Sequence, residues 1–222
     1  MNKFTLVNCD TDSITICRED GSPISAEENE ALIKALNATF PPEIVWTDDG
    51  AFSSVIVLKA KNYVLYDGEK KKIKGSALRG STREKALAEF IGRFIDHLLF
   101  DKFDDLVPLY QSYAKEILNI EDITRWSSKK SLTEKVYEAA ATTQKKILEA
   151  IKGSNYRPGD KAFFYFDNNK NLKLQEHWQK DHDPVVMLKK LFNTIEIFDS
   201  IINTEHFPNY SLKKHKDLLS KI

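Results

Sequence analysis

The sequence predicts an α+β protein in which a β-rich first part precedes a mostly helical second part with one β-hairpin. Short runs rich in Val, Ile, Thr and Phe, bounded by turn residues, occupy most of the first part. Apolar residues then recur at helical spacing, and a single pair of aromatic-rich strands interrupts them. We place the boundary so that residues 1–78 form one domain and residues 79–222 form the other.

The chain opens with two predicted strands, Phe4–Asn8 and Ser13–Cys17, around the polar turn Asp10-Thr11-Asp12. Apolar and polar residues alternate along both strands, which predicts a hairpin with one buried face. The apolar members of this pattern are Phe4, Leu6, Ile14 and Ile16.

A helix is predicted to begin at Ser25, because Glu28 follows three residues later and completes a capping box. The pair Pro41-Pro42 is predicted to end it. Strands at Ser53–Lys59 and Asn62–Tyr66 follow, which gives this part about four strands and one helix.

Two further capping boxes, Ser81 with Glu84 and Ser131 with Glu134, predict helices in the second part. The helix from Ser131 is predicted to run to Gly153. The first helix has an apolar face formed by Leu87, Phe90, Ile91, Phe94, Ile95, Leu98 and Leu99.

A hairpin is predicted from the aromatic run Ala162–Phe166, the turn Asp167-Asn168-Asn169 and a second strand near Leu172. Asp183-Pro184 is typical of a helix start, with a capping residue before proline in the first turn. The inner face of this last helix consists of Met187, Leu188, Leu191, Phe192, Ile195 and Phe198.

Composition sets limits on the class of protein. The 222 residues are 41% hydrophobic, and Lys+Arg equals Asp+Glu at 33 each, so no net charge draws the protein toward nucleic acid. One segment, Lys59 to Gly75, carries six lysines against Asp67 and Glu69, a local charge of +4. No apolar stretch is long enough for a membrane span and no signal peptide is present, so we expect a cytoplasmic protein.

The segment Asp10-Thr11-Asp12-Ser13 is the strongest candidate for chemistry. Two carboxylates at a tight turn between strands project into a small volume, and a hard divalent cation such as Mg²⁺ would neutralise them. Phosphoryl transfer uses cations of this kind. An ordinary polar turn is the alternative for these four residues alone.

The longer stretch Val7–Ile14 resembles motif C of family B DNA polymerases, in which a hairpin with Asp-Thr-Asp-Ser presents metal-binding carboxylates. Asn8 and Cys9 depart from the usual Tyr and Gly. The resemblance implies a two-metal Mg²⁺ site with Asp12 as the principal ligand and Asp10 as the accessory carboxylate. Asp48-Asp49-Gly50 is interpreted first as a turn, and the resemblance offers one of its two carboxylates, with Asp49 as the candidate, as a further acidic group near the metals.

The stretch Lys59-Ala60-Lys61-Asn62-Tyr63, followed by Ile73-Lys74-Gly75, resembles the Lys-Lys-x-Tyr segment of the same family. In the family this segment lies along the minor groove of the primer–template duplex. Lysines beside a turn can contact phosphates and release counterions. The resemblance therefore makes Lys59, Lys61, Tyr63 and Lys74 DNA-binding candidates, and a solvated lysine turn is the alternative.

Two later segments, Ile120–Arg125 and Arg157–Lys161, resemble parts of the family B thumb. They imply that residues 1–78 are the end of the palm and that residues 79–222 are the thumb. The implied contacts to the DNA backbone are Thr124, Arg125, Lys129 and Lys130. The group His177, Trp178, His182 and Asp183 has no metal-ligand spacing and is interpreted as a surface loop.

The sequence shows neither motif A, which carries the other catalytic aspartate of the family, nor the motif B helix that holds the incoming nucleotide. Met1 just before motif C suggests a natural split. The chain is thus expected to be the small subunit of a split polymerase in a prokaryotic, archaeal or phage-infected cell. Its partners would be primer–template DNA, dNTP and a large subunit with exonuclease, fingers and motifs A and B.

Three alternatives stay open. The chain can be a truncated fragment of one polymerase. It can be a non-catalytic DNA-binding accessory module with a vestigial palm, which would bind primer–template without metal. It can also be a helical scaffold unrelated to nucleic acid, if the lysines prove dispersed.

Overall fold

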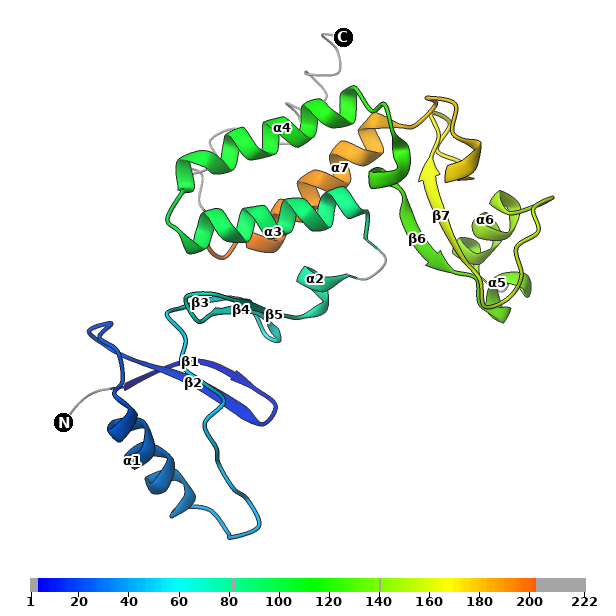
Figure 1. Ribbon diagram of the computed structural model, residues 1–222. Helices are drawn as coiled ribbons and strands as arrows, with labels where there is room; N and C mark the ends of the chain where they lie inside the picture. Colours follow the sequence, from blue (N-terminus) through cyan, green and yellow to red (C-terminus); the bar gives the residue numbers. More distant parts are fainter. Residues whose placement is uncertain (1–3, 81–82, 140, 203–222) are drawn as a thin grey trace. The chain divides into compact units, whose positions relative to one another are not determined.

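The computed structural model describes residues 4–80, 83–139 and 141–202, and it confirms an α+β protein. The chain divides into two compact units, Met1–Gly75 (unit 1) and Ser76–Ile222 (unit 2). Figure 1 gives the order of the elements along the chain. Among the described residues, none of the helices combines the length and hydropathy that crossing a bilayer requires.

Unit 1 begins with an antiparallel hairpin of β1 (Phe4–Asp10) and β2 (Ser13–Arg18). The hairpin matches the predicted strands and extends each of them slightly. The pairing shifts between Leu6 and Asn8, so Asp10 lies opposite Ser13 across the turn. Helix α1 (Ala26–Asn37) follows, and its predicted capping box is confirmed by reciprocal hydrogen bonds between Ser25 and Glu28.

The buried face that the alternation predicts for the hairpin is not formed within unit 1. Leu6 is 59% exposed and Ile14 is 37% exposed. Helix α1 is fixed to the hairpin by an ion pair between Arg18 and Glu28, yet it contains no buried residue. A groove of about 260 Å³ remains between the two, lined by Phe4, Glu28, Ala31, Leu32 and Ala35. Within unit 1 the apolar side chains stay uncovered because α1 meets the hairpin through an ion pair.

A three-stranded antiparallel sheet completes unit 1, with β3 (Ser54–Lys59), β4 (Asn62–Tyr66) and β5 (Lys71–Lys74) in the order β3-β4-β5. The central strand β4 is buried from Asn62 to Leu65. Strand β5 was not predicted, because its sequence, Lys71-Lys72-Ile73-Lys74, has one apolar residue. The described part of unit 1 therefore has five strands, one more than the sequence predicts.

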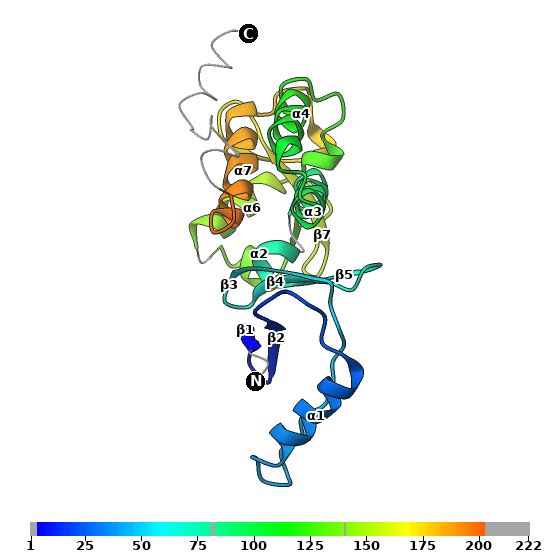
Figure 2. The same cartoon turned by 90° about the vertical axis from the view of Figure 1, so that its left-hand side faces the viewer.

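Unit 2 contains a helical bundle. Its main helices are α3 (Lys85–Leu99), α4 (Leu106–Leu118) and α7 (Pro184–Ile195), which lie side by side in Figures 1 and 2. Shorter elements flank them: α2 (Ser76–Arg79), η1 (Phe103–Asp105), η2 (Ile123–Trp126) and η4 (Glu196–Phe198). The predicted apolar faces of α3 and α7 are the buried ones, apart from Leu99, which is half-buried.

Aromatic rings pack against one another in the bundle core. The rings of Phe94 and Phe198 have centroids 4.5 Å apart, and those of Phe90 and Tyr113 are 5.2 Å apart. Tyr113 also contacts Trp126 edge to face. These contacts join α3, α4, η2 and η4, so the four elements pack as one core.

Of the two capping boxes predicted in unit 2, one includes a residue outside the described ranges and the other is wrong. Ser81 lies outside the described residues, and Glu84 is the residue just before α3, where its buried carboxylate pairs with Lys190 of α7. The box at Ser131 is wrong. Ser131 ends strand β6, and Thr133 precedes a one-turn helix, α5 (Glu134–Tyr137).

The single helix predicted from Ser131 to Gly153 is in fact two helices, α5 and α6 (Thr142–Ala150). The break occurs at Ala139, which adopts a positive φ of 49° and so cannot continue a right-handed helix.

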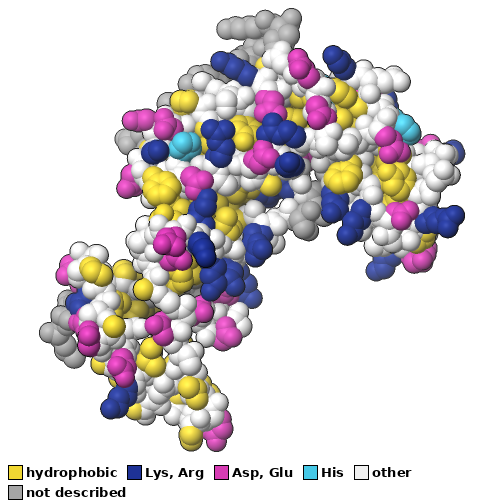
Figure 3. Space-filling view, in the orientation of Figure 1, with side chains coloured by type: hydrophobic (Ala, Val, Ile, Leu, Met, Phe, Trp, Pro, Cys, Tyr) yellow, Lys and Arg dark blue, Asp and Glu magenta, His cyan; other side chains and the backbone are white. Residues whose placement is uncertain are grey.

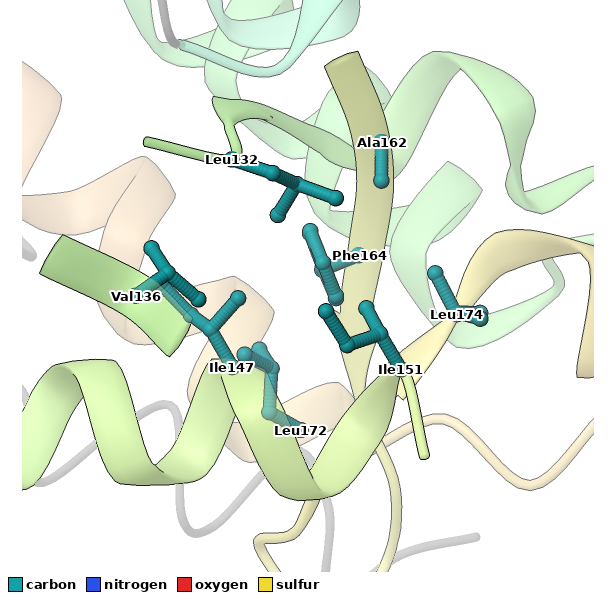
Figure 4. Close-up of a cluster of buried hydrophobic side chains, with 8 residues drawn as sticks. All are labelled: Leu132, Val136, Ile147, Ile151, Ala162, Phe164, Leu172 and Leu174. Carbon is teal, nitrogen blue, oxygen red and sulfur yellow. The ribbon is translucent and has the colours of Figure 1, made fainter. Parts of the chain in front are cut away.

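The predicted hairpin is part of a larger sheet. Strands β7 (Lys161–Phe166) and β8 (Leu172–Leu174) pair as expected, and β6 (Ser128–Ser131) adds a third strand beside β7. The one-turn element η3 (Gln175–His177) follows β8. One face of this sheet packs on α5 and α6 through a cluster shown in Figure 4, formed by Leu132, Val136, Ile147, Ile151, Ala162, Phe164, Leu172 and Leu174.

A charged network holds the loop between β8 and α7. The Lys173 ammonium lies 2.6 Å from Asp181 and 3.2 Å from Asp167, and the buried Tyr165 hydroxyl donates to Asp181. Burial alone would raise the pKa of Asp181, but hydrogen bonds from Lys173 and Tyr165 lower it to about 2. Because this pKa is depressed, the stabilisation is complete above about pH 4 and is lost as the pH falls toward 2.

We expect Lys173→Met to lower the free energy of unfolding by about 2 kcal/mol at neutral pH, because two carboxylates lose their cation. Lys189→Met, at an exposed position of α7, is the matched control and should change little. Urea unfolding at neutral pH and at about pH 3 measures the difference, which should shrink in acid. A difference independent of pH would show that the carboxylates do not carry the effect.

Candidate active site and nucleic-acid interface

The Asp10-Thr11-Asp12 turn is built by the β1–β2 pairing. Thr11 adopts a positive φ of 57°, and the Asp12 amide donates to the Asp10 carbonyl oxygen at 2.8 Å. The Ser13 hydroxyl donates to the same carbonyl. This tight two-residue loop leaves the Asp12 side chain exposed and the Asp10 side chain half-buried. The two carboxylates therefore have different surroundings.

The Asp10 carboxylate is fixed by hydrogen bonds at both oxygens. Thr11 donates to Oδ1 at 3.2 Å, and the Tyr63 hydroxyl donates to Oδ2 at 3.1 Å. Tyr63 comes from the middle strand of the sheet, 53 residues later in the chain, and is 6% exposed. A buried ring with two rotatable bonds is a rigid donor, so Tyr63 sets where Asp10 points.

Three acidic side chains of unit 1 affect the Tyr63 hydroxyl, and Asp10 contacts it directly. Burial raises the pKa of Tyr63, and the hydrogen bond to Asp10 and the negative charges of Asp10, Asp49 and Asp12 raise it further. Asp49 also pairs with Lys72 at 3.0 Å. All three acidic candidates thus act on one hydroxyl, although the Asp49 carboxylate is engaged by a lysine.

Oxygen ligands on an exposed turn suit Mg²⁺, and the exposed Asp12 carboxylate together with the anchored Asp10 fits such an ion. Within the residues that the structure describes, no group of three or more His, Cys, Asp or Glu side chains is close enough to hold a metal ion. Unit 1 as described therefore offers carboxylates for a metal site but not a complete set of ligands.

Lysines surround this region on the neighbouring strands. Lys74 pairs with Tyr63 across β4 and β5, so both side chains are on the same face of the sheet, and Lys72 is two residues before Lys74 on that face. Lys61 occupies the β3–β4 turn with a φ of 62°, and Lys59 ends β3. Figure 3 shows the Lys and Arg side chains gathered over β5.

Sequence reasoning did not single out Lys72. The alternation of a strand would have placed it with Lys74, but β5 itself was not recognised. The sequence also suggested Tyr63 as a DNA contact. In the structure the Tyr63 hydroxyl donates a hydrogen bond to Asp10.

The four candidates of unit 2 have distinct surroundings. Thr124 is exposed at the start of η2, where its amide and hydroxyl donate to Asp122. The Arg125 guanidinium pairs with Glu89 of α3 and Glu116 of α4, and these ion pairs raise its pKa. Arg125 thus joins two helices to η2, and a phosphate would have to compete with two carboxylates for it.

Lys129 and Lys130 are neighbours on β6 and face opposite sides of the sheet. Lys129 pairs with Phe163, and Lys130 pairs with Ala162, which belongs to the buried cluster. Both lysines are half-buried. One flat surface of a ligand cannot contact both side chains, since successive residues of a strand alternate between faces.

The loop with His177, Trp178, His182 and Asp183 supports the start of α7. Asp183 accepts hydrogen bonds from the amides of Val185 and Val186, which is the cap that the sequence predicts. The Trp178 indole donates to Nδ1 of His182, and burial lowers the pKa of that imidazole. These contacts give the loop a structural role.

No protein-family model matches the sequence, and no curated protein matches it. A solved structure is similar: the family B DNA polymerase from the hyperthermophilic archaeon Pyrobaculum calidifontis, with a TM-score of 0.65 and 14% sequence identity. The match covers 90% of this chain and 27% of the polymerase, so the chain spans about a quarter of the length of that protein. The chain therefore has a polymerase-like fold, similar to part of a family B DNA polymerase.

Proposed function

We propose that this chain supplies catalytic carboxylates and duplex contacts to a family B DNA-directed DNA polymerase. The observation that supports the proposal best is the hairpin turn with an exposed Asp12 and an Asp10 held by the buried Tyr63, in a chain with a polymerase-like fold. A buried donor fifty-three residues away is more than an ordinary polar turn requires. It is the kind of support that a catalytic carboxylate needs.

Asp12 and Asp10 would hold Mg²⁺, together with an aspartate from another part of the enzyme. Such ions stabilise the charge on the attacking and leaving oxygens during nucleotidyl transfer. In this proposal Tyr63 orients Asp10 through its hydrogen bond, and Asp12 is the more accessible ligand. Lys72 balances the charge of Asp49.

Duplex binding is assigned to both units. In unit 1, Lys59, Lys61 and Lys74 would contact phosphates of the primer–template, with Lys74 on the face that also presents Tyr63. In unit 2, Thr124, Lys129 and Lys130 are the candidates. We assign Arg125 to positioning η2 between α3 and α4, because the carboxylates of Glu89 and Glu116 already bind its guanidinium.

A second chain, the large subunit with exonuclease, fingers and motifs A and B, would complete the enzyme and bind the dNTP. The uncovered apolar surface of unit 1 supports this part of the proposal. Its large exposed side chains are Leu6, Ile14, Phe40, Ile44 and Val45. They come from the hairpin and from the loop after α1, and several exposed apolar side chains in one small unit are consistent with cover by another protein.

Reconstitution tests this proposal. The chain alone, with primer–template, dNTP and Mg²⁺, should not extend the primer, and co-expression with a chain that carries motifs A and B should give Mg²⁺-dependent extension. The chain with motifs A and B, assayed alone, is the control and should also be inactive.

Extension by either isolated chain would contradict the split. Duplex binding that is indifferent to Mg²⁺ in a mixture that never extends a primer would instead favour the non-catalytic accessory module.

A further inference from the structure

The β6–β7–β8 sheet of unit 2 has a second face, opposite the cluster of Figure 4. Residues of β7 alternate, so Ala162 and Phe164 point into the buried cluster while Lys161 and Phe163 point away from it. Phe163 is 42% exposed, although a phenylalanine in a strand is normally covered. The end of this face at Lys161 and Phe163 is therefore exposed, whereas Tyr165, two residues further along the strand, is buried.

Basic side chains flank Phe163 on this face. Lys129 of β6 is its direct partner across the strands, where side chains stand about 5 Å apart at their Cβ atoms. Lys161 is two residues before it on the same strand, about 7 Å along the sheet. Figure 3 shows dark blue side chains beside hydrophobic ones over the part of the molecule that holds β6 and β7.

The neighbouring surface carries charges of both signs. Lys161 also lines a cavity of about 630 Å³, together with Lys152, Tyr156 and His177. Two acidic residues, Asp160 and Glu176, line it as well, so we place the phosphates at the Phe163 end of the face, away from these carboxylates.

From this arrangement we propose that the Lys129–Lys161–Phe163 face binds single-stranded nucleic acid, with a base stacked on Phe163 and phosphates at Lys129 and Lys161. An exposed ring offers the flat face that unpaired bases stack on, and adjacent lysines match the charge of the backbone. A duplex cannot use the ring in this way, because its bases are already stacked on one another. The proposal concerns unpaired nucleic acid. It shares Lys129 with the duplex contacts proposed above and goes beyond them in the roles of Phe163 and Lys161.

Fluorescence anisotropy with the full chain and a labelled oligothymidylate tests the proposal without metal or partner chain. Phe163→Ala should weaken binding about tenfold, the loss expected for one stacked base, and Phe163→Trp should restore it. Phe100→Ala removes another exposed phenylalanine of unit 2, 51% exposed at the end of α3, and should leave the affinity unchanged.

The charge contribution is separated by salt dependence. Lys129→Gln and Lys161→Gln should each reduce the slope of log affinity against log salt by about 0.7. Lys146→Gln, an exposed lysine on α6 on the other side of the sheet, should leave the slope unchanged.

Three results would overturn the proposal: no binding of the oligothymidylate by the unaltered chain, an unchanged affinity for it in Phe163→Ala, or a loss of affinity for blunt duplex in Phe163→Ala as large as the loss for the oligothymidylate. None of them concerns primer extension, so a failure here is distinct from a failure of the proposed polymerase function.

Discussion

Asp12→Ala is expected to reduce nucleotide addition by the assembled enzyme by about a thousandfold or more, because the proposed function makes Asp12 a ligand of the catalytic metal ions. Duplex affinity should stay nearly the same, since the exposed carboxylate is not a phosphate contact. Stability should also be unaffected, because exposed side chains at turns contribute little. Single-nucleotide incorporation and duplex anisotropy measure the two effects separately.

Glu19→Ala is the matched control for this substitution. It removes an exposed carboxylate of the same unit, just beyond β2, and should retain full activity. If Asp12→Ala retained activity within a fewfold of the unaltered enzyme, the hairpin turn would not be the metal site. A parallel loss in both variants would point to the net charge of unit 1 instead.

Gly75→Ala is expected to have the largest effect on stability, about 3–4 kcal/mol. Gly75 has a φ of 101°, which L residues rarely adopt, and an added Cβ would lie 2.4 Å from the Lys61 carbonyl oxygen and 2.3 Å from the Asn62 side-chain oxygen. Because the carbonyl belongs to the backbone, the β3–β4 turn would have to move. The substitution should also displace Tyr63, the residue after Asn62, from Asp10.

Gly68→Ala separates conformational strain from steric overlap. Gly68 has a similar φ of 105°, but an added Cβ would have no neighbour within 4 Å. Its cost should be limited to strain, about 1 kcal/mol. Hydrogen exchange of the β4 amides should accelerate strongly in Gly75→Ala and weakly in Gly68→Ala, and equal effects would refute the steric explanation.

The elements that the sequence predicted well are those with strong local signals. The β1–β2 hairpin follows from alternation around a polar turn, and the starts of α1 and α7 follow from side-chain caps at Ser25 and Asp183. Helices α3 and α7 were found from their apolar faces. In each case a few adjacent residues determine the local structure.

Other elements depend on contacts that are distant in the sequence. Strand β6 is Ser-Lys-Lys-Ser and becomes a strand only because β7 pairs with it. The segment between α5 and α6 contains no proline or glycine, so the sequence does not predict the break there. Helix α4 is different: Leu106, Leu109, Tyr110, Tyr113 and Ile117 have helical spacing, so the signal was present and was missed.

The candidate site shows the same division. Asp10 and Asp12 were identified from a short motif, but the hydrogen bond from Tyr63 joins residues 53 positions apart and no local pattern encodes it. The ion pairs of Arg125 with Glu89 and Glu116 also need the folded bundle, and they change its assignment from a DNA contact to a structural link. Long-range partners therefore bear on the roles proposed for residues that the sequence marked as candidates.

The central claim is that carboxylates of this chain ligate the catalytic metal, and anomalous diffraction from Mn²⁺ tests it most directly. The sample is the assembled enzyme with primer–template and a non-hydrolysable dNTP. We expect a Mn²⁺ ion within about 2.3 Å of an Asp12 carboxylate oxygen, with Asp10 beside it and still bonded to Tyr63. A fully occupied metal site in which neither Asp12 nor Asp10 is a ligand would contradict the account.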